Sequence, residues 1–198
     1  MASAATAALC LAGVVFALAG PGERGTIFAL QATARLSFLL FWVAYTSSAV
    51  VALGGTLFLP LKRRAREFGL AFASAQSVHF GLVAWLCYVG TPPPFGTFIF
   101  FGIALVWTYL LALFSIARLQ RAIGPWAWWL LRLVALNYIA YAFASDFVRA
   151  PYAGTAKYVL GYLPFVVLSL LGPLLNLMAF VLREINLLRQ ASGRRIAK

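Results

Sequence analysis

The sequence contains few of the side chains that carry chemistry in soluble enzymes. Its 198 residues include only four acidic residues, one histidine and two cysteines. So few carboxylates argue against a carboxylate-pair enzyme. Cys10 and Cys87 provide neither a disulfide framework nor the spacing of a metal site. The sequence also lacks a glycine-rich phosphate loop and a soluble nucleotide or flavin module.

Apolar residues are abundant instead. Hydrophobic residues make up 64% of the chain, charged residues make up 10%, and the mean hydropathy is +0.92. A soluble domain of this composition would expose apolar surface on every side. Six apolar stretches are long enough to span a membrane, at about 2–20, 36–59, 68–89, 96–117, 126–147 and 158–182. The sequence therefore predicts one integral membrane domain over residues 1–198, an all-α bundle of six transmembrane helices.

The basic residues predict the orientation of these helices. Those expected at one end of the bundle are Lys62, Arg63, Arg64, Arg66, Arg118, Arg121, Arg132, Arg183, Arg189, Arg194, Arg195 and Lys198. Those expected at the other end are Arg24, Arg35, Arg149 and Lys157. By the positive-inside rule, both termini lie in the cytoplasm. The basic face suits anionic headgroups of the lipid bilayer, so the net charge of +12 does not require a nucleic-acid partner.

The first apolar stretch has a second interpretation. Its end, residues 17–20, is similar to the cleavage region of a signal peptide. No positively charged residue precedes the apolar run, and this favours an uncleaved first span. Either possibility leaves the C-terminus on the same side of the membrane.

The single histidine, His79, lies in the third apolar stretch. An ionisable side chain is expensive in hydrocarbon, so by default it is a ligand, a proton carrier or an interhelical hydrogen bonder. Gln76 precedes His79 by one helical turn, so the two share a face of the helix. They either satisfy each other or a neighbouring helix, through a group such as Asn137 or Tyr141, or they line a cofactor cavity.

Residues 33–50, 61–80 and 111–147 carry a resemblance to a known family. Arg63-Arg64, Gly69-Leu70 and His79 follow one another there as in a motif that leads to a haem-ligand histidine, with two extra residues between the arginine pair and the glycine. Over about residues 33–147 the chain resembles the ferric-reductase-like transmembrane family. It is particularly similar to the haem-bearing membrane subunits of bacterial periplasmic methionine sulfoxide reductase systems. The resemblance implies a multi-pass protein of the bacterial inner membrane, with His79 as a haem ligand.

Two other ligand positions of that family hold different residues here. Leu131 and Ala144 stand where the family has histidines. A six-coordinate haem b needs two axial ligands, and this chain has one histidine. Haem would therefore be five-coordinate on His79, or its second ligand would be Met178 or a residue of another subunit.

These observations leave three functional hypotheses. The first is at most a one-haem electron-transfer subunit of oxidoreductase type, which is not a self-contained catalyst. A quinone or flavin donor would supply its electrons and a periplasmic redox partner would accept them. Gln76 would then lie beside the haem, and Arg63, Arg64 and Arg132 would anchor headgroups or propionates, although topology alone also explains these arginines. The alternative is a haem-free structural or accessory subunit, and the third hypothesis is a small proton-coupled transporter using His79 and Asp146.

Overall fold

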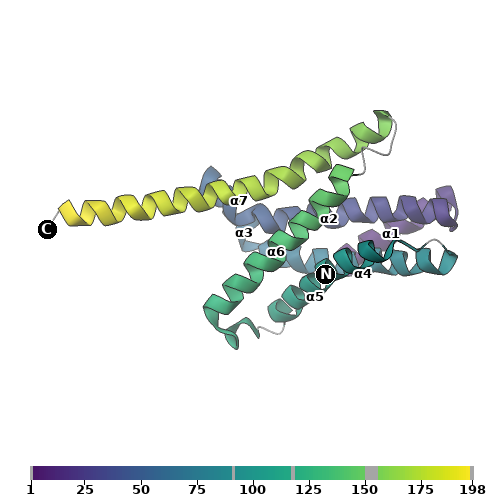
Figure 1. The fold of residues 1–198 in the computed structure, drawn as a ribbon, viewed down its shortest axis with the longest axis horizontal. Helices are drawn as coiled ribbons and strands as arrows, with labels where there is room; N and C mark the ends of the chain where they lie inside the picture. Colours follow the sequence, from purple (N-terminus) through teal and green to yellow (C-terminus); the bar gives the residue numbers. More distant parts are fainter. Residues whose placement is uncertain (1, 91, 117–118, 150–155, 197–198) are drawn as a thin grey trace.

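The computed structural model describes residues 2–90, 92–116, 119–149 and 156–196, and their side chains except those of 120, 156–158 and 191–196. These residues form helices and no strand. The elements are α1 (Ala2–Ala19), α2 (Glu23–Gly54), the 3-10 helix η1 (Thr56–Phe58), α3 (Leu59–Arg63), α4 (Ala65–Val89), α5 (Phe95–Ile116), the 3-10 helix η2 (Leu119–Arg121), α6 (Gly124–Arg149) and α7 (Ala156–Ile196). Six of them, α1, α2, α4, α5, α6 and α7, contain a segment long and apolar enough to cross a membrane (Figure 1). The predicted all-α bundle with six spans is therefore confirmed.

The spans alternate in direction because short connections join them. The chain ends of α1 and α7 thus lie on one side of the bundle, and α3, with its basic residues, lies on that side as well. We call this side the inner end and the opposite side the outer end. Two basic residues of the orientation argument, Arg118 and Lys198, lie outside the described residues.

The second span differs most from its prediction, because α2 begins at Glu23 rather than near residue 36 and ends at Gly54. Two threonines in its first half, Thr26 and Thr33, are fully buried, and their hydroxyls donate to carbonyls of the preceding turn. Thr26 donates to the Gly22 carbonyl at 2.9 Å and Thr33 to the Ala29 carbonyl at 2.8 Å. A hydropathy window counts such residues as polar, although each conceals its polar atom against the preceding turn.

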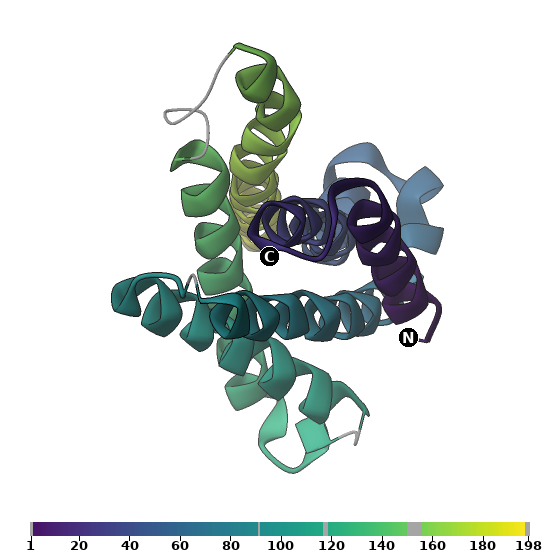
Figure 2. The same ribbon diagram turned by 90° about the vertical axis from the view of Figure 1, so that its right-hand side faces the viewer.

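Helix α2 is the centre of the bundle. It packs against α1 and α4 on one side and against α7 on the other, while α6 packs against α5 and α7 (Figure 2). A layer of aromatic side chains fills the space between α2 and α6. Phe38 is its centre, with ring centroids 4.9 Å from Phe147, 5.3 Å from Phe143 and 6.2 Å from Phe165. This layer ties α2, α6 and α7 together.

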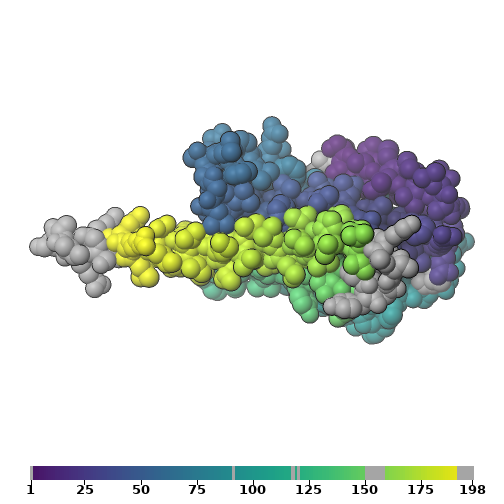
Figure 3. All heavy atoms as spheres, turned by 90° about the horizontal axis from the view of Figure 1, so that it is seen from above, coloured from purple at the N-terminus to yellow at the C-terminus, as the bar shows by residue number. Residues whose placement is uncertain are grey.

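Helix α7 remains one helix through Pro164 and Pro173. Its 41 residues correspond to a length of about 60 Å, roughly twice what a bilayer core requires. Its C-terminal part projects beyond the other helices at the inner end (Figure 3). Where it touches α2, Trp42 Nε1 donates to the Leu168 carbonyl at 2.8 Å.

Candidate functional site

A cavity of about 360 Å³ lies between α2, α4, α5 and α6. This volume is at the lower end of the range for small-molecule sites. Its lining residues are Ile27, Leu30, Gln31, Ala34, Phe72, Gln76, His79, Phe80, Val83, Pro93, Thr97, Phe98, Phe101, Gly102, Ala104, Leu105, Thr108, Ile139, Ala142, Phe143, Asp146, Phe147 and Tyr162. Helices α4 and α6, the third and fifth spans, thus face each other across a cavity. We call it the outer cavity, because Ile27 and Pro93 place one end of it near the outer end of the bundle.

His79 is half-buried in the wall of the outer cavity and is held by α2. Its Nδ1 lies 3.0 Å from Thr33 Oγ1. The Thr33 hydroxyl has one hydrogen, which it donates to the Ala29 carbonyl at 2.8 Å. Thr33 therefore accepts a hydrogen bond from His79, so the proton of a neutral imidazole is on Nδ1. Nε2 then keeps its lone pair and can accept a hydrogen bond or ligate a metal.

The depth of His79 follows from the helix geometry. His79 lies ten residues before the end of α4, and Thr33 lies ten residues after the start of α2. At the rise of an α-helix, both are about 15 Å from the outer end. The pair therefore lies within the membrane-spanning part of the bundle, where an interhelical hydrogen bond has no water to compete with it.

Gln76 lies one turn deeper on the same face of α4 and also lines the outer cavity. Its Oε1 atom is buried and has no hydrogen-bond partner among the described residues. A buried acceptor without a partner costs free energy of about 1–3 kcal/mol. A ligand with an N–H or O–H group would remove this cost.

Asp146 is the one residue of the described lining able to carry a full negative charge, and no described arginine or lysine lines the outer cavity. The next residue along α6, Phe147, packs on Phe38. Phe38 lies 15 residues after the start of α2, which places it about 22 Å from the outer end. Asp146 therefore lies at about the depth of Gln76, although it is only three residues from the end of α6. Seven aromatic side chains complete the lining: Phe72, Phe80, Phe98, Phe101, Phe143, Phe147 and Tyr162.

The structure brings together only part of the predicted site. His79 and Gln76 both line the outer cavity, whereas Arg63, Arg64 and Arg132 do not. The first two arginines are exposed near the inner end. Arg132 lies on α6, with its guanidinium 5.9 Å from the centre of the Trp128 ring.

Leu131 and Ala144, the positions at which the resembled family has histidines, are also outside the cavity lining. Met178 is 47% exposed on α7 and does not line the cavity either. The described lining thus offers one axial ligand, no second histidine, methionine or cysteine, and no cation for the anionic propionates. These residues do not fit a six-coordinate haem held by this chain alone.

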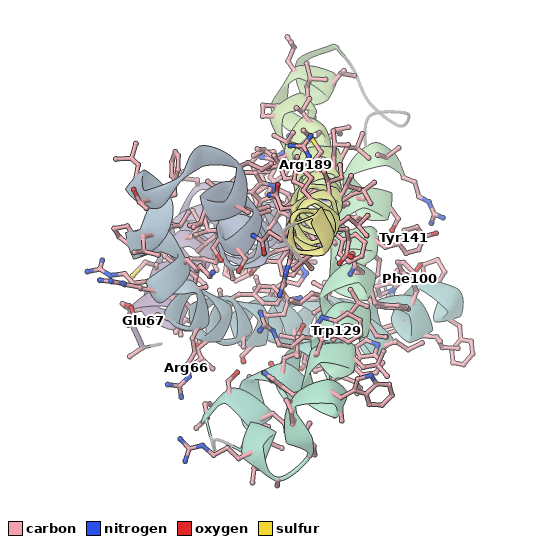
Figure 4. The ribbon with its side chains drawn as sticks, turned by 90° about the vertical axis from the view of Figure 1, so that its left-hand side faces the viewer. Arg66, Glu67, Phe100, Trp129, Tyr141 and Arg189 are labelled. Atoms are coloured by element: carbon pink, nitrogen blue, oxygen red, sulfur yellow. The ribbon has the colours of Figure 1, made fainter. Side chains whose placement is uncertain are left out.

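Sequence reasoning missed the true partner of His79. Asn137 accepts a hydrogen bond from Tyr45 at 2.8 Å instead. Tyr141 on α6 is 60% exposed and packs against Phe100 on α5. Both side chains are labelled in Figure 4. The signal that could have identified Thr33 is its spacing: Thr26 and Thr33 are seven residues apart, which places both on one face of a longer helix.

Arg35 is also placed differently from its prediction as a residue of the outer end. It lies inside α2, with its guanidinium 4.5 Å from the ring centre of Tyr162 and 5.5 Å from that of Phe165. Aromatic faces on α7 thus stabilise this cation within the bundle.

No protein-family model, curated protein or solved structure matches this chain. The geometry of the outer cavity is therefore the basis for any statement about function.

Proposed function

We propose that this multi-pass membrane protein is a haem-free subunit that binds one small ligand in the outer cavity. The observation that carries the proposal is the pair of polar atoms on α4. His79 is fixed through Nδ1 by Thr33, and Gln76 Oε1 has no partner. Both residues line the same cavity, which is otherwise mostly apolar. A few polar groups on an apolar wall are typical of sites that orient a small ligand.

The test is to close the outer cavity without disturbing the helices around it. Gly102 lines the cavity on α5, and a Cβ added there has no atom within 4 Å. Gly102→Leu therefore fills the cavity without a backbone clash. Gly69→Leu is the matched control, since Gly69 is a helical glycine with equally open surroundings outside the lining.

Small molecules extracted from the purified protein would be identified by mass spectrometry. We expect a compound that copurifies with the wild type and with Gly69→Leu and is lost from Gly102→Leu. The ¹⁵N resonances of the single histidine should change between wild type and Gly102→Leu in parallel. Equal small-molecule content and unchanged resonances in all three proteins would contradict the proposal.

A five-coordinate haem on His79, in an electron-transfer subunit of ferric-reductase-like type, is the second candidate. It is favoured by one observation, the hydrogen bond from Nδ1 to Thr33, because metal-ligating histidines usually donate their other ring N–H to a neighbouring oxygen. A quinone or flavin donor and a periplasmic redox partner belong to this candidate only. Absorbance spectra of the oxidised and dithionite-reduced protein decide between the two. A Soret band that disappears in a folded His79→Ala variant would support haem, and a protein purified intact without such a band would support the haem-free subunit.

A further inference from the structure

We infer that the ligand of the outer cavity is a protonated amine, an organic cation with an ammonium head and an apolar body. This inference rests on the proposed ligand-binding function and names the chemical class of the ligand. Three independent properties of the lining lead to it: its charge, its hydrogen-bonding atoms and its aromatic rings.

The charge of the lining is opposite to that of the protein. The chain has 16 basic and four acidic residues, yet the described lining includes Asp146 and no arginine or lysine. One described cation, Arg35, lies behind the lining against the rings of Tyr162 and Phe165, whereas the Asp146 side chain is exposed, so its carboxylate is the charge that a ligand meets. Anionic ligands are therefore disfavoured and cationic ligands are attracted.

Two acceptor atoms of α4 in the cavity lining are free to bind a ligand. Gln76 Oε1 is buried without a partner, and His79 uses its one neutral-state proton on Thr33, so Nε2 presents a lone pair. Two acceptors one helical turn apart match a ligand head with more than one hydrogen to donate. A primary ammonium group has three hydrogens and no lone pair.

The seven aromatic side chains of the lining suit both parts of such a ligand. Phe72, Phe143 and Phe147 lie near the level of Asp146, since they belong to the layer around Phe38. A cation within about 6 Å of an aromatic face is stabilised by about 0.5–2 kcal/mol. The other lining rings provide apolar surface for the ligand body.

The test compares three probes that share a phenylethyl body and differ in their head. They are 2-phenylethylammonium, which is cationic, propylbenzene, which is neutral, and 3-phenylpropanoate, which is anionic. Binding of each radiolabelled probe would be measured on the full chain in lipid nanodiscs, with empty nanodiscs subtracted. The ¹⁵N resonances of His79 report whether the probe occupies the outer cavity. We expect the cation to bind most tightly and to shift these resonances.

Asp146→Asn should weaken binding of the cation at least about fivefold, the effect of one unit-charge pair at about 4 Å in bulk water. Binding of propylbenzene should be unchanged. Glu23→Gln is the matched control, because Glu23 is an exposed acid at the start of α2, outside the cavity lining. Arg149→Gln should strengthen cation binding, because Arg149 follows Asp146 by one turn without lining the cavity.

Each outcome supports or overturns a defined statement. Equal or tighter binding of the neutral or anionic probe would overturn the ammonium ligand but leave the ligand-binding cavity intact. If Asp146→Asn and Glu23→Gln weaken cation binding equally, the effect comes from the overall charge of the protein, and the ammonium ligand is overturned as well. If no probe binds or shifts the His79 resonances, and Gly102→Leu changes neither them nor the copurifying molecules, the proposed function itself fails. The ¹⁵N spectrum also shows that each variant retains the Thr33–His79 contact of the folded bundle.

Discussion

The protonation of His79 can be predicted atom by atom, because the protein has a single histidine. In the wild type we expect the neutral tautomer with the proton on Nδ1. The reason is local: the Thr33 hydroxyl donates to the Ala29 carbonyl, so its oxygen is free to accept from Nδ1 at 3.0 Å. The perturbation that tests this is Thr33→Val, which has nearly the same shape and removes the acceptor.

The size of the effect follows from the environment of the hydrogen bond. Measured side-chain hydrogen bonds between membrane helices average about 0.6 kcal/mol and reach about 1.7 kcal/mol. A factor of ten in an equilibrium corresponds to about 1.4 kcal/mol. Thr33→Val should therefore lower the ratio of Nδ1–H to Nε2–H tautomer by about threefold to about twentyfold. Stability should fall by a similar free energy, because the imidazole loses its hydroxyl partner on α2.

The assay is ¹⁵N NMR of protein labelled only at histidine, in which two ring nitrogens give all the signals. Protonated and unprotonated nitrogens differ widely in chemical shift, so the tautomer is read directly. Thr6→Val is the control, because Thr6 bonds only to the Ala2 carbonyl of its own exposed helix turn. A wild-type protein with the proton on Nε2, or a tautomer ratio that Thr33→Val leaves unchanged, would refute the assignment.

Three further predictions concern the packing around α2, measured as unfolding free energies in mixed micelles. Phe38→Ala should lower the free energy of unfolding by about 3–5 kcal/mol, since the side chain is 1% exposed and contacts three rings. Leu39→Ala should lower it by under about 1 kcal/mol, because Leu39 is 42% exposed, and equal losses would contradict the aromatic layer. Gly172→Leu should cost about 1–3 kcal/mol, because a Cβ there lies only 3.3 Å from ring atoms of α2, whereas Gly102→Leu should leave stability nearly unchanged. Tyr45→Phe should lower the free energy of unfolding by about 0.6 kcal/mol, because it removes the hydrogen bond from Tyr45 to the Asn137 amide of α6. A loss above about 1.7 kcal/mol would mean that the packing of the ring is disturbed as well.

The spans could be predicted because membrane solvation imposes a coarse rule on the sequence. A lipid-facing segment must be apolar over about 20 residues, and the six stretches satisfy this rule. The rule fails at the start of α2, because Thr26 and Thr33 return their hydroxyls to the helix and bury themselves against neighbouring helices. Arg35 also lies within the bundle, and there its guanidinium is stabilised by the aromatic rings of Tyr162 and Phe165 on α7.

The candidate site was predictable in part for the same reason. His79 and Gln76 stand out because each is costly in hydrocarbon on its own helix, and both do line the outer cavity. Their surroundings depend on how other helices approach, and one sequence does not encode this as a local pattern. The depth of Asp146 is an example: its position near the end of α6 suggests an interface, but the contact of Phe147 with Phe38 draws that end inward.

The packing on the inner side of the outer cavity favours binding over passage. Phe41, Phe72 and Phe143 come from α2, α4 and α6, and their ring centroids lie 5.4, 5.7 and 6.1 Å apart in pairs. Three rings in mutual contact leave no room for water between them, so they close the space between α2, α4 and α6 on the side of the basic inner end. A proton or solute entering from the outer end would have to displace an aromatic cluster that also holds the three helices together. Phe72→Ala is therefore expected to open a leak in proteoliposomes that the wild type lacks, and a wild-type protein with equal flux would favour a transporter instead.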